Sequence, residues 1–261
     1  MKSRQTSHIV FILLGSIVLL LIIAPLTGLF LSTSGIEIFE TARDKEVMES
    51  IRLTILVSFF ATLFVSVFAI PLSYLLARHN FPGRELVNSI IDLPIVIPHS
   101  AAGIAILGFI SRDSVLGSLA DSIGLNFIGH PVGIGLAMAF VSVPFLINSA
   151  RDGFSLVPDK LEKAALNLGA SPTRVFFTIS LPLTWRHIIS GAIMMFARGM
   201  SEFGAVVIVA YHPMITPVLI YERFGAFGLK YARPVAALFI IVCLLFFVLL
   251  RILSNRRFAD R

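Results

Sequence analysis

Two charged residues lie four positions apart in an otherwise apolar stretch, at Arg198 and Glu202. At that spacing they share one face of a helix and can form an ion pair. Charged groups inside a membrane span are costly, and they are usually functional or mutually neutralised. The pair is therefore either a structural contact between helices or part of a gate that rearranges between states. Ser201 adds a hydroxyl group to the same stretch.

A second polar cluster, within residues 91–103, contains Pro94, Pro98 and His99. Two prolines four residues apart remove hydrogen bonds from adjacent helical turns, so this helix must bend or unwind. Broken backbone at membrane depth is tolerated only inside protein or beside a water-filled cavity. The sequence therefore predicts that this stretch and the Arg198–Glu202 stretch line a translocation path. A kinked packing helix with a hydrogen-bonded histidine is the alternative.

The longest polar interruption begins at residue 161 and leads to Leu181 and Pro182. Gly169 can adopt the left-handed conformation that ends a helix, and Ser171-Pro172 can begin the next one. Helical spacing places four apolar residues on one narrow face of the first helix, namely Leu161, Ala164, Ala165 and Leu168. The segment predicts a rigid docking element for a partner outside the membrane, with an ordinary interfacial helix as the alternative.

These clusters are set in a very apolar chain of 261 residues, of which 57% are hydrophobic and 14% charged, with a mean hydropathy of +0.92. Apolar runs near 20 residues long predict an all-α membrane protein with six transmembrane helices. The first run is too long for a cleaved signal peptide and lacks a small-residue cleavage site. The six predicted spans cover about 9–31, 50–77, 88–110, 132–150, 187–210 and 233–253.

Several functional classes lack their sequence signatures. Cys243 is the single cysteine, so the chain has no disulfide framework and no cysteine-based metal site. It contains no G-x-x-x-x-G-K-[ST] phosphate loop, so ATP hydrolysis would require another polypeptide. No nucleic-acid-binding motif accompanies the net charge of +6. We expect a chain that is not an enzyme and that binds no metal, no cofactor of its own and no nucleic acid.

The distribution of Lys and Arg predicts the orientation. With both termini in the cytoplasm, the inner segments hold 13 of these residues and the outer segments seven. The positive-inside rule favours this arrangement. It places residues 151–186 in the cytoplasm, between spans four and five. It places 211–217 and 221–224 outside, where their tyrosines and charges form either interface anchors or a contact surface for an external protein.

The polar segment resembles the coupling loop of importer-type ABC permeases, in which Ala-Ala, a glycine four residues later and Ile-x-Leu-Pro recur. Ala164, Ala165, Gly169, Ile179, Leu181 and Pro182 occupy the matching positions. Lys163 stands where that family has an acidic residue, and Glu162 precedes it by one position, so the role of the family's glutamate is not transferred. The resemblance assigns the ATPase-coupling loop to Glu162, Lys163, Ala164, Ala165, Gly169, Ile179, Leu181 and Pro182.

Two further stretches are similar to permeases for molybdate, tungstate and sulfate: Leu-Pro-x-x-x-Pro-x-x-x-x-Gly at 93–103 and Ala-Arg-x-x-x-Glu-Phe-Gly-Ala at 197–205. The resemblance implies a homodimer with the path at its two-fold axis. It also implies two ATP-binding subunits, which bind ATP and Mg²⁺, and an extracytoplasmic oxyanion-binding protein. The residues expected at the path or gate are Pro94, Pro98, His99, Arg198, Ser201 and Glu202.

The hypothesis is therefore the pore-forming subunit of an ATP-driven importer of a tetrahedral oxyanion, molybdate or tungstate, in the cell membrane. A sulfate-type permease and, as a different class, an ion-coupled secondary carrier are the alternatives. The expected organisation is a first span and outer segment at 1–49, a permease core at 50–253 and a cytoplasmic tail at 254–261. Within this protein, the two regions that carry the hypothesis are the docking element and the residues of the path.

Overall fold

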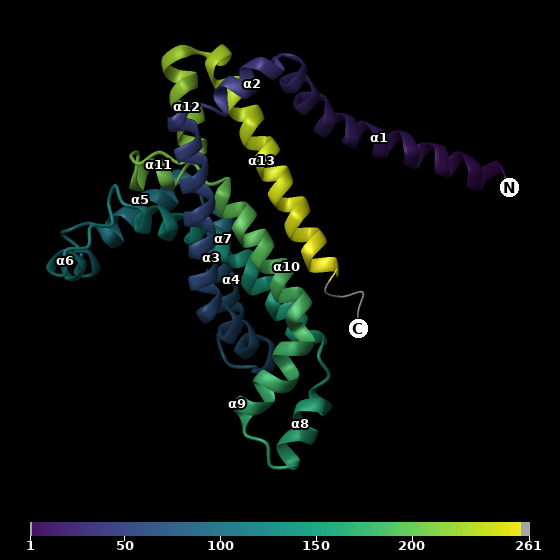
Figure 1. Ribbon diagram of the computed structural model, residues 1–261. Helices are drawn as coiled ribbons and strands as arrows, with labels where there is room; N and C mark the ends of the chain where they lie inside the picture. The colour runs from purple at the N-terminus through teal and green to yellow at the C-terminus, as the bar shows by residue number, and fades with distance from the viewer. Residues whose placement is uncertain (1, 257–261) are drawn as a thin grey trace.

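The computed structural model describes residues 2–256, which form helices joined by short connections, with no strand among them (Figure 1). Of the expected tail at 254–261, residues 257–261 lie outside the described part. The helices are α1 (Lys2–Leu31), α2 (Gly35–Thr41), α3 (Lys45–Arg78), α4 (Arg84–Val96), α5 (His99–Ile110), α6 (Val115–Ser122), α7 (Pro131–Leu156), α8 (Asp159–Asn167), α9 (Pro172–Val175), the π-helix η1 (Phe176–Ser180), α10 (Leu181–Met200), α11 (Val206–Val209), α12 (Thr216–Phe227) and α13 (Leu229–Arg256).

The centre of the molecule is a bundle in which α7 packs against both α3 and α10 (Figure 1). Apolar side chains fill the contacts, including the fully buried Ala137, Met138 and Leu146 of α7. Helix α13 packs against α12 and α10. Helix α1 points away from the bundle, and the apolar part of it, Val10–Leu31, buries no residue within the chain (Figure 1). An apolar helix without a protein partner requires lipid or another subunit around it.

Four of the described helices are long and apolar enough to cross a membrane: Val10–Leu31, Lys45–Arg78, Pro131–Leu156 and Leu229–Leu250. They coincide with four of the six spans expected from the sequence. The pair α4 and α5 makes a fifth candidate if it is counted as one broken span. The structure therefore has four or five candidate spans, and six remain a prediction.

The expected span at 88–110 is broken, as its prolines predict. Helices α4 and α5 meet at an angle of 112°. Pro94 lies buried inside α4, and the chain turns only at Ile97 and Pro98, where both residues are extended. A proline disfavours helical backbone at the residue before it and supplies no N–H of its own, so Pro98 ends α4 and begins α5.

The expected span at 187–210 is not a continuous helix. Helix α10 ends at Met200, and a turn separates it from the four-residue helix α11. The carboxylate of Glu202 accepts a hydrogen bond from the backbone N–H of Ala205 at 2.8 Å, so it satisfies a donor at the start of α11. A side chain that caps a new helix in this way stabilises the interruption.

Candidate functional site

The broken span and the interrupted α10 meet at a buried charged group, which we call the central cluster: His99, Arg198 and Glu202. Oε2 of Glu202 lies 2.7 Å from Nδ1 of His99 and 3.0 Å from Nη2 of Arg198. Its other oxygen, Oε1, accepts the bond from Ala205. Both carboxylate oxygens are thus occupied, as a buried carboxylate requires.

Arg198 approaches both of its neighbours through one nitrogen. Nη2 lies 3.1 Å from Nδ1 and 3.0 Å from Nε2 of His99, in addition to its contact with Glu202. Nη1 lies 3.4 Å from Oγ of Ser201. The ion pair predicted from the four-residue spacing is therefore present, and His99 joins it from α5. In a medium of low dielectric, this pairing cancels the charge that either partner alone would expose.

Accessibility differs sharply within the central cluster. The Glu202 side chain is 1% exposed, whereas those of Arg198 and His99 are 24% and 41% exposed. Ser201 is also exposed. The Glu202 carboxylate is therefore sealed inside the protein, while the Arg198 guanidinium, the His99 ring and the Ser201 hydroxyl are partly exposed. Such a surface can donate hydrogen bonds to a passing anion.

Glycines allow the two broken elements to approach closely. A Cβ atom on Gly204 would lie 2.6 Å from Cβ of His99, and one on Gly103 would lie 2.9 Å from the carbonyl oxygen of Ala205. Any larger residue at either position would force α5 away from the turn at 201–205. The specific partners of these glycines are visible only in three dimensions.

Of the six residues expected at the path or gate, the structure brings four together: His99, Arg198, Ser201 and Glu202. Pro98 is adjacent, at the start of α5. Pro94 does not join them, because it is buried within α4. The function of these residues as a gate remains a prediction, which is developed below.

The second region is the docking loop, defined as residues 158–182, at the end of the molecule where α8 and α9 lie (Figure 1). Gly169 has φ +87°, in the left-handed region that disfavours side chains, and a Cβ atom there would meet no other atom within 4 Å. Ser171 caps α9 by accepting a hydrogen bond from the N–H of Arg174 at 3.3 Å, and Pro172 follows it. The helix, glycine turn and second helix thus have the predicted order.

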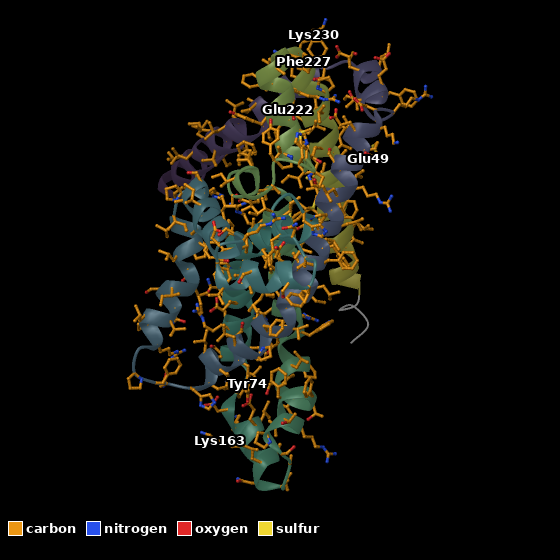
Figure 2. The ribbon with its side chains drawn as sticks, turned by 90° about the vertical axis from the view of Figure 1, so that its left-hand side faces the viewer. Glu49, Tyr74, Lys163, Glu222, Phe227 and Lys230 are labelled. Atoms are coloured by element: carbon orange, nitrogen blue, oxygen red, sulfur yellow. The ribbon has the colours of Figure 1, made fainter. Side chains whose placement is uncertain are left out.

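Helix α8 presents one face outward and one inward. Lys163, Ala164, Leu161 and Leu168 are exposed, and Ala165 is half-buried. The narrow apolar face expected from the sequence is therefore available to a partner, with Lys163 beside it (Figure 2). Because alanine side chains are short, another surface can approach this helix closely.

Glu162 faces the opposite way, into the protein. Its Oε1 accepts hydrogen bonds from Nη2 of Arg78 at 2.7 Å, Nε of Arg78 at 3.0 Å and Oγ of Ser180 at 2.6 Å. Its Oε2 accepts one from the hydroxyl of Tyr74 at 3.1 Å. Burial opposes ionisation of this carboxyl group, but the bonds from Ser180 and Arg78 and the charge of Arg78 outweigh it and lower the pKa of Glu162.

The remaining residues of the docking loop connect α8 to α10. Ile179 lies in the π-helix η1, and Leu181 packs against the buried Ala150, Phe154 and Ile188. Pro182 lies in the first turn of α10, directly after the π-helix, and supplies no backbone N–H to this continuous helical run. The π-helix was not predicted, and neither were Tyr74, Arg78 and Ser180 as partners of Glu162.

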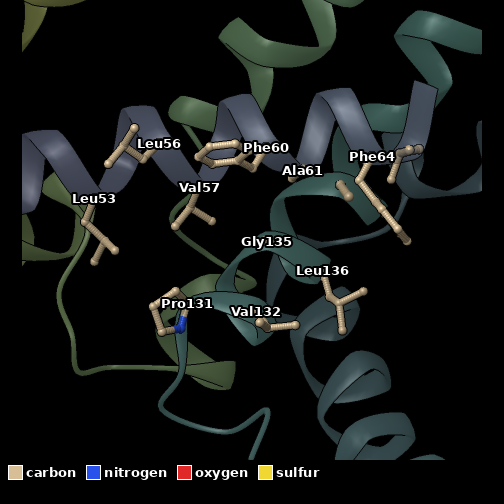
Figure 3. Close-up of a pocket in the computed structure, with 12 residues that line it drawn as sticks. Leu53, Leu56, Val57, Phe60, Ala61, Phe64, Pro131, Val132, Gly135 and Leu136 are labelled. Atoms are coloured by element: carbon tan, nitrogen blue, oxygen red, sulfur yellow. The ribbon is translucent and has the colours of Figure 1, made fainter. Parts of the chain in front are cut away.

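The structure also has an open apolar groove of about 520 Å³ between α3 and α7 (Figure 3). Every side chain that lines it is apolar, so the groove cannot offer hydrogen bonds to an oxyanion. It suits an apolar helix or lipid chains. Its lining is Leu53, Leu56, Val57, Phe60, Ala61, Phe64, Val65, Pro131, Val132, Gly135, Leu136 and Ala139. Within residues 2–256, no group of three or more His, Cys, Asp or Glu residues could hold a metal ion.

Comparison with known proteins gives a consistent family. Residues 69–261 match the family described as "Binding-protein-dependent transport system inner membrane component". The chain is 43% identical over 258 residues to the molybdate/tungstate transport system permease protein WtpB of Thermococcus kodakarensis, covering 98% of this chain and 99% of that one. It is 33% identical over 211 residues to a probable sulfate transport system permease protein of Chlorokybus atmophyticus, covering 78% and 73%.

A solved structure shares the fold. A chain of a bacterial ABC transporter involved in the import of the acidic polysaccharide alginate superposes with a TM-score of 0.74, at 19% identity, and the match covers 97% of this chain and 96% of that one. At that identity the likeness concerns the fold alone.

Proposed function

Because this chain belongs to the family of binding-protein-dependent transport system inner membrane components, we propose that it forms the transmembrane path of an ATP-driven importer of molybdate or tungstate. The observation that carries the substrate class is the likeness to a molybdate/tungstate permease over almost the whole of both chains. Molybdate and tungstate are tetrahedral oxyanions of the same charge, and hydrogen-bond donors of the same kind would suit both.

We propose that the working unit is a homodimer in the cell membrane with the path at its two-fold axis. Each subunit would cross six times, with both termini in the cytoplasm. Helix α10, which leads from the docking loop to the central cluster, would form the fifth span. The permease core would be 50–253. Two apolar surfaces support a second copy: the uncovered helix α1 and the groove between α3 and α7.

The docking loop would bind the ATPase. The outward apolar face of α8, the left-handed Gly169 and the charge of Lys163 support this assignment. The coupling residues would be Glu162, Lys163, Ala164, Ala165, Gly169, Ile179, Leu181 and Pro182, with Glu162 acting inside the protein. ATP and Mg²⁺ would be bound by two partner ATPase subunits, and an extracytoplasmic binding protein would deliver the oxyanion.

The central cluster would act as a gate. The Arg198–Glu202 pair lies within one stretch of chain, whereas the contact with His99 crosses to α5. Separation of the two elements would therefore break the His99 contact and leave the ion pair intact. Nucleotide on one side and loaded binding protein on the other would shift the equilibrium between states, because each would bind one state more tightly.

Uptake of radiolabelled molybdate into proteoliposomes tests the proposal. The vesicles would contain this subunit with its cognate ATPase and would be supplied with the loaded binding protein. We expect uptake to require ATP on the side of the membrane where the ATPase lies. We also expect tungstate to inhibit this uptake more strongly than sulfate does. Inhibition mainly by sulfate would favour the sulfate-type permease. Uptake driven by a pH or sodium gradient without ATP would instead favour an ion-coupled carrier that uses the central cluster as its titratable site.

A further inference from the structure

Helix α3 is attached at both of its ends to helices that lie at opposite ends of the molecule. Its 34 residues extend about 51 Å, well beyond the roughly 30 Å of the hydrocarbon core. Helix α12 lies at one end of the bundle and α8 at the other (Figure 1). Side chains show the same separation, with Phe227 near one end and Tyr74 and Lys163 near the other (Figure 2).

The attachment to α12 consists of an ion-pair group and a backbone cap. Nη2 of Arg223, on α12, lies 2.6 Å from Oδ2 of Asp44 and 3.0 Å from Oε2 of Glu46 at the start of α3. In addition, Oγ1 of Thr54 accepts a hydrogen bond from the N–H of Thr216 at 2.9 Å. Since α12 has no side-chain cap of its own, α3 satisfies a backbone donor at its first turn.

The attachment to α8 uses every nitrogen of one arginine. Arg78, in the last turn of α3, donates to Glu162 through Nε and Nη2, to Asp159 through Nη1 at 3.0 Å and to the carbonyl of Val157 through Nη2 at 3.0 Å. The side chains of Arg78 and Glu162 are only 9% and 10% exposed. A planar guanidinium can hold several acceptors in fixed directions at once, which a lysine cannot do.

Between these attachments, α3 is continuous and held by its neighbours. Oγ of Ser58 donates to the carbonyl of Phe196 on α10 at 2.8 Å, and Gly199 leaves room for that contact. Pro71 removes one backbone hydrogen bond but does not end the helix. A hydrogen-bonded helix of this kind does not shorten or lengthen appreciably, so a displacement of one end moves the other.

We propose that α3 is a rigid link that transmits displacement between α12 and α8, with Arg223 and Arg78 as the positioning residues at its two ends. The inference rests on the proposed function, which supplies an external binding protein on the α12 side and an ATPase on the α8 side. Binding of the loaded protein against α12 would thereby change the position of the docking loop. When two such sites are coupled, each ligand changes the binding free energy of the other by the same amount.

The experiment measures ATP hydrolysis by the complete reconstituted complex with and without the loaded binding protein, together with co-purification of the ATPase. The variants are Arg78→Met and Arg223→Met. The matched controls are Arg84→Met, near the same end of α3 as Arg78, and Lys45→Met, which removes an exposed pair with Glu49 near Arg223. Arg78→Lys and Arg223→Lys keep the positive charge. They replace the methionine variants in the stimulation measurement if those fail to assemble with the ATPase.

We expect Arg223→Met, and Arg78→Lys, which keeps a cation beside Glu162, to retain the ATPase and basal hydrolysis, while stimulation by the binding protein falls about fivefold or more. Arg78→Met, which leaves Glu162 without its ionic partner, should also lose part of the ATPase, Arg223→Lys should recover part of the stimulation, and the controls should match the wild type. Normal stimulation in assembled Arg78 and Arg223 variants would overturn the inference, and so would an equal loss in the controls. If the wild-type complex itself retained no ATPase, the proposed function would fail instead, which is a distinct result.

Discussion

The central cluster and the docking loop each bury one glutamate beside one arginine, but they connect the chain differently. Arg198, near the end of α10, is four residues from Glu202 in the following turn, so that ion pair can persist while α10 and this turn move together. Arg78 is 84 residues from Glu162, so that pair joins two separate helices. His99 reaches Glu202 across 103 residues, but its side chain is 41% exposed. The docking loop is therefore built around a contact that must persist, and the central cluster around one that can be broken.

This difference has an electrostatic basis. Separating His99 from Glu202 leaves the carboxylate paired with Arg198, so no isolated charge is created in a low dielectric. Separating Arg78 from Glu162 would leave each of these buried charges without its ionic partner, which costs several kcal/mol. We therefore expect movement at the central cluster to cost less free energy than movement between α3 and α8.

The largest expected effect comes from Glu202→Gln, which leaves the charge of Arg198 unpaired. A single central charge in a span costs about 2.5–3.5 kcal/mol. We expect molybdate uptake to fall roughly a hundredfold, with less protein in the membrane. Uptake normalised to the amount of membrane protein separates the two effects. Glu49→Gln, on an exposed glutamate, is the control and should leave uptake unchanged.

A combined Arg198→Gln and Glu202→Gln variant sharpens the comparison. It removes both charges, so insertion should recover, but the contact with His99 and the bond to the Ala205 N–H are weakened. We expect normal membrane levels and defective uptake. Normal uptake in this double variant would show that the central cluster is only a structural ion pair.

The next effect is smaller and concerns Glu162→Gln. Replacing an ionised acceptor by a neutral amide weakens its hydrogen bonds with Arg78 by about 2 kcal/mol. Amide hydrogen exchange in α8 should become roughly 30-fold faster at pH 7. Lys163→Gln, on the adjacent exposed residue, is the control. Amide hydrogen exchange in α8 should be unchanged in this variant. Equal protection of α8 in the Glu162 variant would contradict the role of this pair.

The same pair predicts a dependence of stability on pH. The folded protein lowers the pKa of Glu162, so its contribution is fully present above the ordinary glutamate pKa of about 4.3 and is lost as pH falls through the lower, folded-state value. The difference in Tm between wild type and Glu162→Gln should be constant from pH 8 to about pH 5 and shrink below that. A difference that shrank near pH 7 would indicate another titrating group.

Sequence reasoning found the parts of both regions that depend on local geometry. The spacing of Arg198 and Glu202, the left-handed Gly169 and the break at Pro98 all follow from rules that act within a few residues. It did not find the contacts of His99 with Glu202 or of Arg78 with Glu162. Those contacts depend on how separate helices pack, and a single sequence contains no periodic signal for them.

Interruption of the fifth expected span shows the same limit. Residues 187–210 are apolar enough on average to be interpreted as one helix, yet α10 ends at Met200. The turn after it contains a specific bond from the Ala205 N–H to Glu202 and the close approach of His99 to Gly204. Hydropathy averages over these residues and is insensitive to such bonds.

Gly169→Val should affect the docking loop alone, by about 1–2 kcal/mol of backbone strain. Because no atom lies near the glycine, this strain is the whole local effect. We expect the variant to enter the membrane normally and to lose the co-purifying ATPase. Gly225→Ala, in α12 and also without close neighbours, is the control. If Gly169→Val retained the full amount of co-purifying ATPase and normal uptake, the turn would have no role in docking.

The smallest expected effect is a change of a few-fold in the reactivity of a cysteine at Ser201, in a background where Cys243 is replaced. Ser201 is exposed beside Arg198: its Oγ lies 3.4 Å from Nη1 and donates to the Arg198 carbonyl at 3.0 Å. Neither contact involves Glu202, so the substitution leaves the buried ion pair in place. A water-soluble thiol reagent should label it, and the rate should differ between nucleotide-free and ATP-trapped complexes, because a gate at this depth changes its access to water. Leu244→Cys, on the apolar surface of α13, should stay unreactive in both states, since the reagent does not enter lipid. Labelling of a cysteine at position 244 but not at position 201 would place the water-filled path elsewhere in the molecule. The central cluster would then be a permanent contact, like the one between Arg78 and Glu162.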